Sequence, residues 1–368
     1  MESHSKSQLS ILVKKLDFVL ISIVSAAALV SLIVLYSAAN GELFFVKRQL
    51  FRLAIATSCM LAITMVPFET IRRHTMTFNI VCILLLIWVI THGHIGKGAQ
   101  RWIDLGFFRF EPSELCKVAI PLLTARFIAN CSTPIKLIDS LFLFGLISVP
   151  TVLVLLQPDL GTAIILMTVG VSAIFMAGLS HRIILVSLAC AVALLPISWD
   201  YLHDYQKLRL INFFYPDNDP LGTGYHILQS KIAIGSGGIF GYGLLSGPQV
   251  RLKFIPEHYT DFVFSLIGEE FGLLGTFFVL ILFAGLTIRG FMIAWQADDL
   301  FTKISIACLT LSITLSSIIN ISMTNLIDSG NSQKIRHLEK LRQKIDFYYK
   351  LTDLVDDMEK EITRKIRF

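Results

Sequence analysis

The feature that most constrains this chain is a series of long apolar runs, the first of which follows Lys14 and Lys15 and reads LDFVLISIVSAAALVSLIVLYSA. About 20 apolar residues in a helix cross the hydrocarbon core of a bilayer. A cleaved signal sequence has an apolar region of only about 7–15 residues, so we expect this run to be an uncleaved first span. Charged residues make up only 16% of the chain, against about 25% in a soluble domain. The sequence therefore predicts an integral membrane protein.

Further apolar runs predict an all-α, polytopic helix bundle of about nine spans. These runs are residues 51–66, 76–90, 113–129, 140–156, 160–179, 183–199, 262–286 and 304–323. The six cysteines are scattered through the apolar stretches without CxxC or Cys/His spacing. They therefore indicate neither a disulfide framework nor a metal site.

The distribution of cations indicates how the bundle is oriented. With the N-terminus in the cytoplasm, the cytoplasmic turns carry Arg72, Arg73, Arg126, Lys136, Arg182, Arg289 and Lys303, as the positive-inside rule prefers. The outer side then also holds many cations, namely Lys47, Arg48, Lys97, Arg101, Arg109, Lys207, Arg209, Lys231, Arg251 and Lys253. Either the topology is weakly encoded, or the outer face binds an anionic ligand. We favour the second interpretation because these cations share loops with the motifs described below.

Two outer loops have a length that is uncommon unless the loop has a function. The first covers about residues 92–112 and the second about residues 200–260. The second loop is rich in glycine, but no strand precedes Gly235 and no acid follows at the spacing of a dinucleotide-binding fold, which excludes that class of site. An apolar re-entrant or surface helix beside a protein-lined or wet cavity is the better interpretation.

Ionisable residues at the spans mark candidate functional positions, because a charge within the bilayer is costly. Glu114 and Lys117 lie three residues apart on one helical face, either as a structural ion pair at the interface or as a pair that lines a substrate cavity. Asp159, in LQPDLGTA, lies at an outer turn and is either the N-cap of the next helix or part of the same cavity. The second alternative requires all three side chains to face one cavity.

The segment FIPEHYTDFVFSLIGEEFG places carboxylates at and within the start of a span. Asp261 is either an N-cap or a general base at the membrane surface, where burial and nearby cations tune its basicity. Glu269 is expected to be buried, with Lys117 as a candidate partner, beside a strip of small residues that permits close helix packing: Ser265, Gly268, Gly272 and Gly275. Glu270 is expected to point away from this cavity.

Four segments resemble, in sequence and in order, the signature segments of the SEDS family (shape, elongation, division and sporulation) and of its rod-shape branch in particular. They are FEPSELCKVA, LQPDLGTA, NDPLGTGYHILQSKIAIGSGG and RLKFIPEHYTDFVFSLIGEEFG. The likeness covers about residues 10–322. It implies a ten-helix, multi-pass protein of the bacterial inner membrane. The implied activity is that of a peptidoglycan glycosyltransferase, which polymerises lipid II into glycan strands on the outer face during cell elongation and rod-shape maintenance.

The resemblance also implies partners and residue roles. The implied partners are lipid II, a class B penicillin-binding transpeptidase and the elongation machinery, and we expect no nucleic acid. Asp261 matches the family's catalytic aspartate, which would remove the proton from the acceptor sugar's 4-hydroxyl. Glu114 and Lys117 match its membrane cavity pair, and Asp159 matches the acid of its QPD motif.

Glycan polymerisation also needs positive charge to stabilise the departing lipid pyrophosphate. The expected phosphate contacts are Arg101, Lys207, Arg209 and Arg251. A divalent cation such as Mg²⁺ or Mn²⁺ is another means of supplying that charge, but no cluster of ligands marks a site.

The chain departs from the family after about residue 323, so we expect a membrane bundle over residues 1–326 and an unrelated tail over residues 327–368. Apolar residues at three-to-four spacing predict an amphipathic helix in the tail, either lying on the bundle or forming a coiled coil with a partner. Two other functions stay open: a lipid II flippase, and a non-catalytic scaffold for the transpeptidase. A base at the outer surface favours the polymerase, because a flippase has no need of a proton acceptor there.

Overall fold

The computed structural model describes residues 16–96, 99–104, 106, 109–178, 207, 211, 223–248 and 262–322. The chain divides into two compact units, Met1–Thr324 and Asn325–Phe368. The span predicted at residues 183–199 and the tail predicted at residues 327–368 lie outside the described residues, so both stay predictions.

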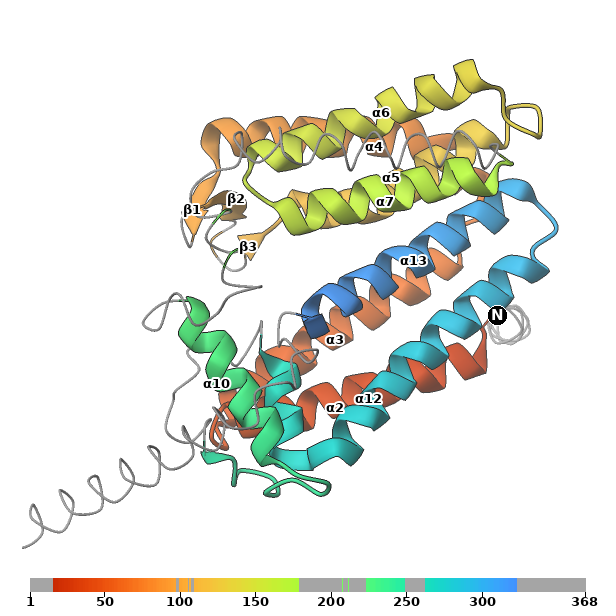
Figure 1. Ribbon diagram of the computed structural model, residues 1–368. Helices are drawn as coiled ribbons and strands as arrows, with labels where there is room; N and C mark the ends of the chain where they lie inside the picture. The colour runs from red at the N-terminus through yellow and green to blue at the C-terminus, as the bar shows by residue number, and fades with distance from the viewer. Residues whose placement is uncertain are drawn as a thin grey trace, which may run out of the picture. The chain divides into compact units, whose positions relative to one another are not determined.

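The other predicted spans are α-helices (Figure 1). The helices that match them are α2 (Phe18–Ala38), α3 (Leu43–Thr64), α4 (Phe68–His92), α5 (Pro112–Ile128), α6 (Leu137–Leu156), α7 (Leu160–Met176), α12 (Val263–Gln296) and α13 (Leu300–Ser322). By length and composition, α2, α4, α6, α12 and α13 are each able to cross a membrane. The predicted fold class, a polytopic helix bundle, is confirmed.

Helix α3 begins earlier than the sequence predicted. Its first residue is Leu43 rather than residue 51, so Lys47 and Arg48 lie in its first turns and not in an outer loop. The Arg48 guanidinium lies 5.7 Å from the centre of the Phe44 ring one turn earlier. Long cationic side chains can pack their stems on a helix while their charged ends reach the membrane surface, which explains why the helix extends through them.

Helix α5 contributes to the larger hydrophobic core and contacts four neighbouring helices, α4, α6, α7 and α13. Figure 1 shows α4, α5, α6 and α7 running side by side. Fully buried side chains from each of the first three helices meet there, including Leu86, Ile120 and Leu143. Helix α13 contacts this group and also α12, which packs on α2. The outer ends of α5 and α7 are thereby held close together.

The first outer loop contains a small sheet that the sequence analysis did not predict. Strands β1 (His94–Gly96), β2 (Ala99–Asp104) and β3 (Arg109–Phe110) form an antiparallel sheet in the order β1-β2-β3. The central strand, β2, contacts α4 and α5. Strand pairing satisfies the backbone polar groups of a connection that lies against the helix ends. It also fixes the backbone position of Arg101 in β2.

In the second outer loop, the expected apolar helix is present as α10 (Thr223–Ser236), which packs against α12. The close packing expected of the small residues in α12 occurs at Gly268, where a Cβ atom would lie 2.9 Å from Cγ1 of Ile234 in α10. The strip of small residues does not continue along a straight helix, however. Helix α12 is broken at Gly272, whose backbone has φ 65° and ψ −157°.

The break in α12 is filled by the backbone of residues 237–243. Leu273 N donates to Gly238 O at 2.9 Å, and Leu274 N donates to Ile239 O at 3.2 Å. In return, the carbonyl oxygens of Glu269 and Glu270 accept from the backbone N–H groups of Tyr242 and Gly243, at 3.0 and 2.9 Å. Irregular backbone at membrane depth needs partners of this kind. The inserted loop and the first turns of α12 therefore form one hydrogen-bonded unit, which we call the loop–helix junction.

Candidate active site at the outer ends of the helices

Glu114 and Lys117 form an ion pair on the first turns of α5. Lys117 Nζ lies 2.7 Å from Glu114 Oε1, and the lysine side chain is 17% exposed while the glutamate side chain is 56% exposed. The pair places its cation toward the protein and its carboxylate toward the outside. This geometry agrees with the predicted pairing, while the choice between a structural role and a substrate role stays a prediction.

Asp159 is the N-cap of α7, as one of the two sequence alternatives predicted. Its Oδ1 accepts a hydrogen bond from Thr162 N at 3.3 Å. The same carboxylate oxygen lies 3.9 Å from Nη1 of Arg101. Arg101 also donates from Nε to the carbonyl oxygen of Gln157 at 3.0 Å and from Nη2 to that of Pro158. The guanidinium therefore fastens strand β2 to the turn between α6 and α7.

Glu111 also belongs to this cluster, and the sequence analysis did not single it out. It precedes the first residue of α5, and its carboxylate accepts a hydrogen bond from Ser113 Oγ at 3.0 Å. Burial raises the pKa of the Glu111 carboxyl above its ordinary value of 4.5, and the nearby Asp159 carboxylate raises this pKa further. The only sequence signal for Glu111 was its place in the segment FEPSELCKVA. Its proximity to Asp159 could not be predicted, because the two residues come together only when α5 and α7 pack.

The raised pKa of Glu111 predicts a specific pH dependence of stability. The folded state holds this proton more tightly than the unfolded chain, so the associated stability is complete below pH 4.5 and is lost as the pH rises through the folded-state pKa. We expect Glu111→Gln to remain neutral and to melt at a higher temperature than the wild type at neutral pH, with no such difference in acid. Melting curves in detergent across this pH range test the expectation.

Asp104→Asn is the matched control, because the pKa of the Asp104 carboxyl is shifted in the opposite direction. The hydrogen bond from Gly106 N–H is the main cause that lowers this pKa, and the positive charge of Arg109 lowers it further. That stability is present above the unfolded pKa and is lost as the pH falls through the folded-state pKa, so this variant should lose stability at neutral pH. An equal shift of both variants in the same direction would contradict the assignment.

Glu269 and Glu270 are both buried, with 0% and 1% exposure. The prediction for Glu269 is therefore confirmed for its burial, and Glu270, which was expected to point away from the predicted cavity, is buried as well. Glu270 Oε1 accepts hydrogen bonds from Ser37 Oγ of α2 and from Leu245 N, the latter at 3.1 Å. Leu245 N also donates to Ser37 Oγ at 3.1 Å. Glu270 thus connects α2, α12 and the inserted loop.

Lys117, the candidate partner for Glu269, pairs with Glu114 instead. A neighbour three residues away on the same helix is always within reach. Glu269 lies in α12, whereas Lys117 lies in α5. Helix α13 contacts both of these helices. The Glu269 carboxylate lies against the loop, since a Cβ atom on Gly247 would be 2.8 Å from Glu269 Oε2. The break in α12 brings the inserted loop, rather than Lys117, to Glu269.

Three predicted residues, Asp261, Arg209 and Arg251, lie outside the described residues, and their roles stay predictions. Lys207 is described as helical and partly buried. Phe262, which follows Asp261 in the sequence, is the N-cap of α12. Among the residues that the structure describes, no three His, Cys, Asp or Glu side chains converge to hold a metal ion.

Comparison with known sequences covers most of the chain. Residues 8–327 match the model of the family described as cell cycle protein, FtsW/RodA/SpoVE. Peptidoglycan glycosyltransferase MrdB of Escherichia coli (strain K12) is 40% identical over 311 residues, which cover 84% of this chain and 84% of that protein. The protein of the same name in Helicobacter pylori is 36% identical over 265 residues, covering 70% of this chain and 68% of the relative.

Solved structures share the fold. One, described as structural coordination of polymerization and crosslinking by a peptidoglycan synthase complex, has a TM-score of 0.72 and 29% identity, covering 84% of this chain and 87% of that one. The rod shape determining protein RodA of Thermus thermophilus has a TM-score of 0.63 and 23% identity, covering 85% and 86%. Together with the sequence matches, this agreement shows that the chain belongs to the FtsW/RodA/SpoVE family of multi-pass bacterial inner-membrane proteins.

Proposed function

We propose that this chain is a peptidoglycan glycosyltransferase that polymerises lipid II on the outer face of the inner membrane during cell elongation. The observation that carries the proposal is the 40% identity, over 84% of both chains, to a protein named peptidoglycan glycosyltransferase. The charged cluster of Arg101, Glu111, Glu114, Lys117 and Asp159 at the outer ends of α5 and α7 supports it. Within it, the two cations Arg101 and Lys117 are the proposed contacts for an anionic pyrophosphate, and each lies beside a carboxylate.

The orientation of α12 supports Asp261 as the proposed base. Asp17, the N-cap of α2, pairs with Arg289 near the other end of α12, with an Nη2–Oδ2 distance of 2.6 Å. This pair fixes α2 and α12 antiparallel with Asp17 and Arg289 at the cytoplasmic ends, so α12 begins at the outer ends of the helices. Asp261 immediately precedes that start in the sequence. A base there is suited to remove the proton from the acceptor 4-hydroxyl of a sugar that emerges from the membrane.

In the proposed reaction, the acceptor oxygen attacks the anomeric carbon of the second lipid II molecule as its proton passes to Asp261. The bond from that carbon to the pyrophosphate breaks, and the lipid pyrophosphate leaves as an anion. Cations near the leaving group stabilise this charge. Lys117 and Arg101 are the proposed cations within the described cluster, and Lys207, Arg209 and Arg251 are further proposed contacts.

We also propose a class B penicillin-binding transpeptidase as a partner. A relative of similar fold belongs to a peptidoglycan synthase complex in which polymerization and crosslinking are coordinated. Glycan strands need crosslinking after polymerisation, so a transpeptidase is the partner whose chemistry follows directly. The purified chain should therefore be assayed both alone and with its transpeptidase.

The role of Lys117 is separable from simple structural support. We expect Lys117→Met to reduce polymerisation by about ten-fold or more, because a hydrogen bond to a charged group is worth about 1.5–3 kcal/mol. The loss should appear as a raised KM for lipid II if the cation contacts the pyrophosphate in the bound substrate. Steady-state kinetics and a melting curve on the same preparation provide both readouts.

Glu114→Gln is the matched variant, because it weakens the same ion pair but keeps the lysine. A purely structural pair predicts that both variants lose melting temperature together and keep the wild-type KM. A substrate role predicts that only Lys117→Met changes KM strongly.

The lipid II flippase remains the second candidate function, because the charged cluster would also suit transport of an anionic lipid. The decisive assay uses purified protein, lipid II and the transpeptidase, and measures glycan strands by gel electrophoresis. Strands support the polymerase. Transport of lipid II across liposomes by folded protein that makes no strands would support the flippase instead.

A further inference from the structure

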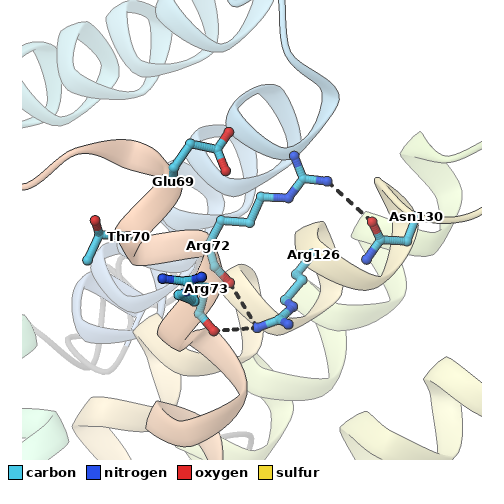
Figure 2. A pocket seen from close by; sticks show the side chains of 6 residues that line it. All are labelled: Glu69, Thr70, Arg72, Arg73, Arg126 and Asn130. Atoms are coloured by element: carbon cyan, nitrogen blue, oxygen red, sulfur yellow. Dashed lines mark hydrogen bonds between the residues drawn. The ribbon is translucent and has the colours of Figure 1, made fainter.

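A second polar site lies at the cytoplasmic ends of α4 and α5. It is a cavity of about 420 Å³ lined by Glu69, Thr70, Arg72, Arg73, Arg126 and Asn130. Figure 2 shows that the three arginines come from the two neighbouring helices, and that the Arg72 guanidinium is directed toward Asn130. This cavity lies at the opposite membrane face from the candidate active site, so the proposed polymerase does not use it.

The guanidinium groups of Arg72 and Arg126 have neutral hydrogen-bond partners in the described part of the chain. Arg126 Nη1 donates to the carbonyl oxygens of Arg72 and Arg73, at 2.9 and 2.8 Å. Arg72 Nη2 donates to Asn130 Oδ1 at 3.2 Å. Within the described residues, no carboxylate forms an ion pair with any of the three arginines, and Glu69 is the only acid among the lining residues. The cavity therefore has an excess of positive charge that an anion would balance.

The level of the cavity in the membrane indicates the kind of anion. Arg72 and Arg73 lie within the first two turns of α4, and Arg126 lies in the last turn of α5. These are the ends that the positive-inside rule places in the cytoplasm. The cavity is therefore at the depth where phospholipid phosphates of the cytoplasmic leaflet lie.

An apolar surface continues from the cavity along α4. Met76, Ile80 and Leu84 follow Arg73 at intervals of three or four residues, so they form one stripe of the helix. Their side chains are 47%, 54% and 60% exposed. A soluble anion would make no contact with this apolar stripe. The acyl chain of a lipid whose phosphate binds at Arg73 would lie beside it.

We propose that Arg72, Arg73 and Arg126 bind the phosphate of an anionic phospholipid in the cytoplasmic leaflet, with one acyl chain along the Met76–Leu84 stripe of α4. The planar guanidinium fork matches two phosphate oxygens. The carbonyl contacts of Arg126 hold its guanidinium in the cavity before the lipid arrives, which reduces the ordering required for binding.

The test uses the full chain in neutral detergent, with phosphatidylglycerol, phosphatidylcholine or inorganic phosphate added separately. Retained lipid is measured by native mass spectrometry and affinity by the shift in melting temperature. We expect phosphatidylglycerol to bind more tightly than the other two probes. Arg73→Gln should weaken its binding about five-fold, the effect of one cation near an anionic membrane surface, and the Arg72→Gln/Arg73→Gln pair should weaken it further.

Two further variants separate a built site from general surface charge. Arg73→Lys keeps the charge but loses the fork, so we expect part of the affinity to remain. Lys136→Gln removes an exposed cation at the same membrane face but outside the cavity, and should bind phosphatidylglycerol as the wild type does. An equal loss in Lys136→Gln, wild-type binding by the arginine pair variant, or equally tight binding of inorganic phosphate would each overturn the proposal.

Discussion

Asp261→Asn is expected to reduce glycan-strand synthesis from lipid II by at least about 100-fold, because a general base contributes about 10²–10⁴-fold to the rate. Asparagine has nearly the same shape but cannot accept the proton of the acceptor 4-hydroxyl. The variant should therefore fold and bind lipid II normally while failing in the chemical step. Polymerisation by the purified chain with its transpeptidase added, together with lipid II binding, measures both properties.

Asp298→Asn is the matched control for this experiment. Asp298 is an exposed carboxylate at the cytoplasmic turn between α12 and α13, so its replacement removes one negative charge far from the outer face. We expect wild-type activity from it. Equal product from wild type and Asp261→Asn would remove Asp261 from the mechanism. If folded wild-type protein makes no strands under any condition, the transport and scaffold functions become the better candidates.

Gly241→Ala is expected to be among the most destabilising single substitutions in the described residues. Gly241 has φ +77°, and a Cβ atom there would lie 2.1 Å from the carbonyl oxygen of Glu270. Left-handed backbone costs an ordinary residue about 1–2 kcal/mol. In addition, the loop would have to move away from α12 at a cost of about 1–3 kcal/mol. The hydrogen bonds of the loop–helix junction would weaken as a result.

Gly243→Ala isolates the contribution of close packing. Gly243 has φ +90°, so alanine is strained there too, but a Cβ atom would meet nothing within 4 Å. We expect Gly241→Ala to lower the free energy of unfolding by about 1–3 kcal/mol more than Gly243→Ala. Thermal unfolding in detergent measures the difference. Equal losses would show that backbone strain alone matters and that the close approach to α12 does not.

The activity of Gly241→Ala tests whether the loop–helix junction supports the proposed active site. The junction holds the first turns of α12, and Asp261 immediately precedes that helix in the sequence. We expect Gly241→Ala to lower the polymerisation rate at temperatures where the protein is still folded. Wild-type activity in folded Gly241→Ala would show that Asp261 does not depend on the junction for its position.

Much of the membrane organisation was predictable because it depends on local sequence. The length of an apolar run determines whether a helix can cross a bilayer, and cations in the turns determine its orientation. The N-cap role of Asp159 was predictable for the same reason, since it requires only the backbone N–H of Thr162 three residues later. The Glu114–Lys117 pair likewise follows from helical periodicity.

The positions that needed the tertiary structure are those where two distant segments meet. Arg101 reaches Asp159 only because β2 packs at the helix ends, and burial beside Asp159 affects Glu111 only after α5 and α7 are in contact.

The sequence alone predicted the apolar spans, their orientation, the local caps and pairs, and the family resemblance, because each depends on neighbours along the chain or on short motifs. Only the tertiary structure showed that α12 breaks at Gly272, that Glu270 is buried against Ser37, and that three arginines share one cavity. The physical reason for this difference is that a bilayer stabilises any helix that is sufficiently long and apolar, whatever its neighbours. Which buried carboxylate or guanidinium finds which partner depends on how the helices pack.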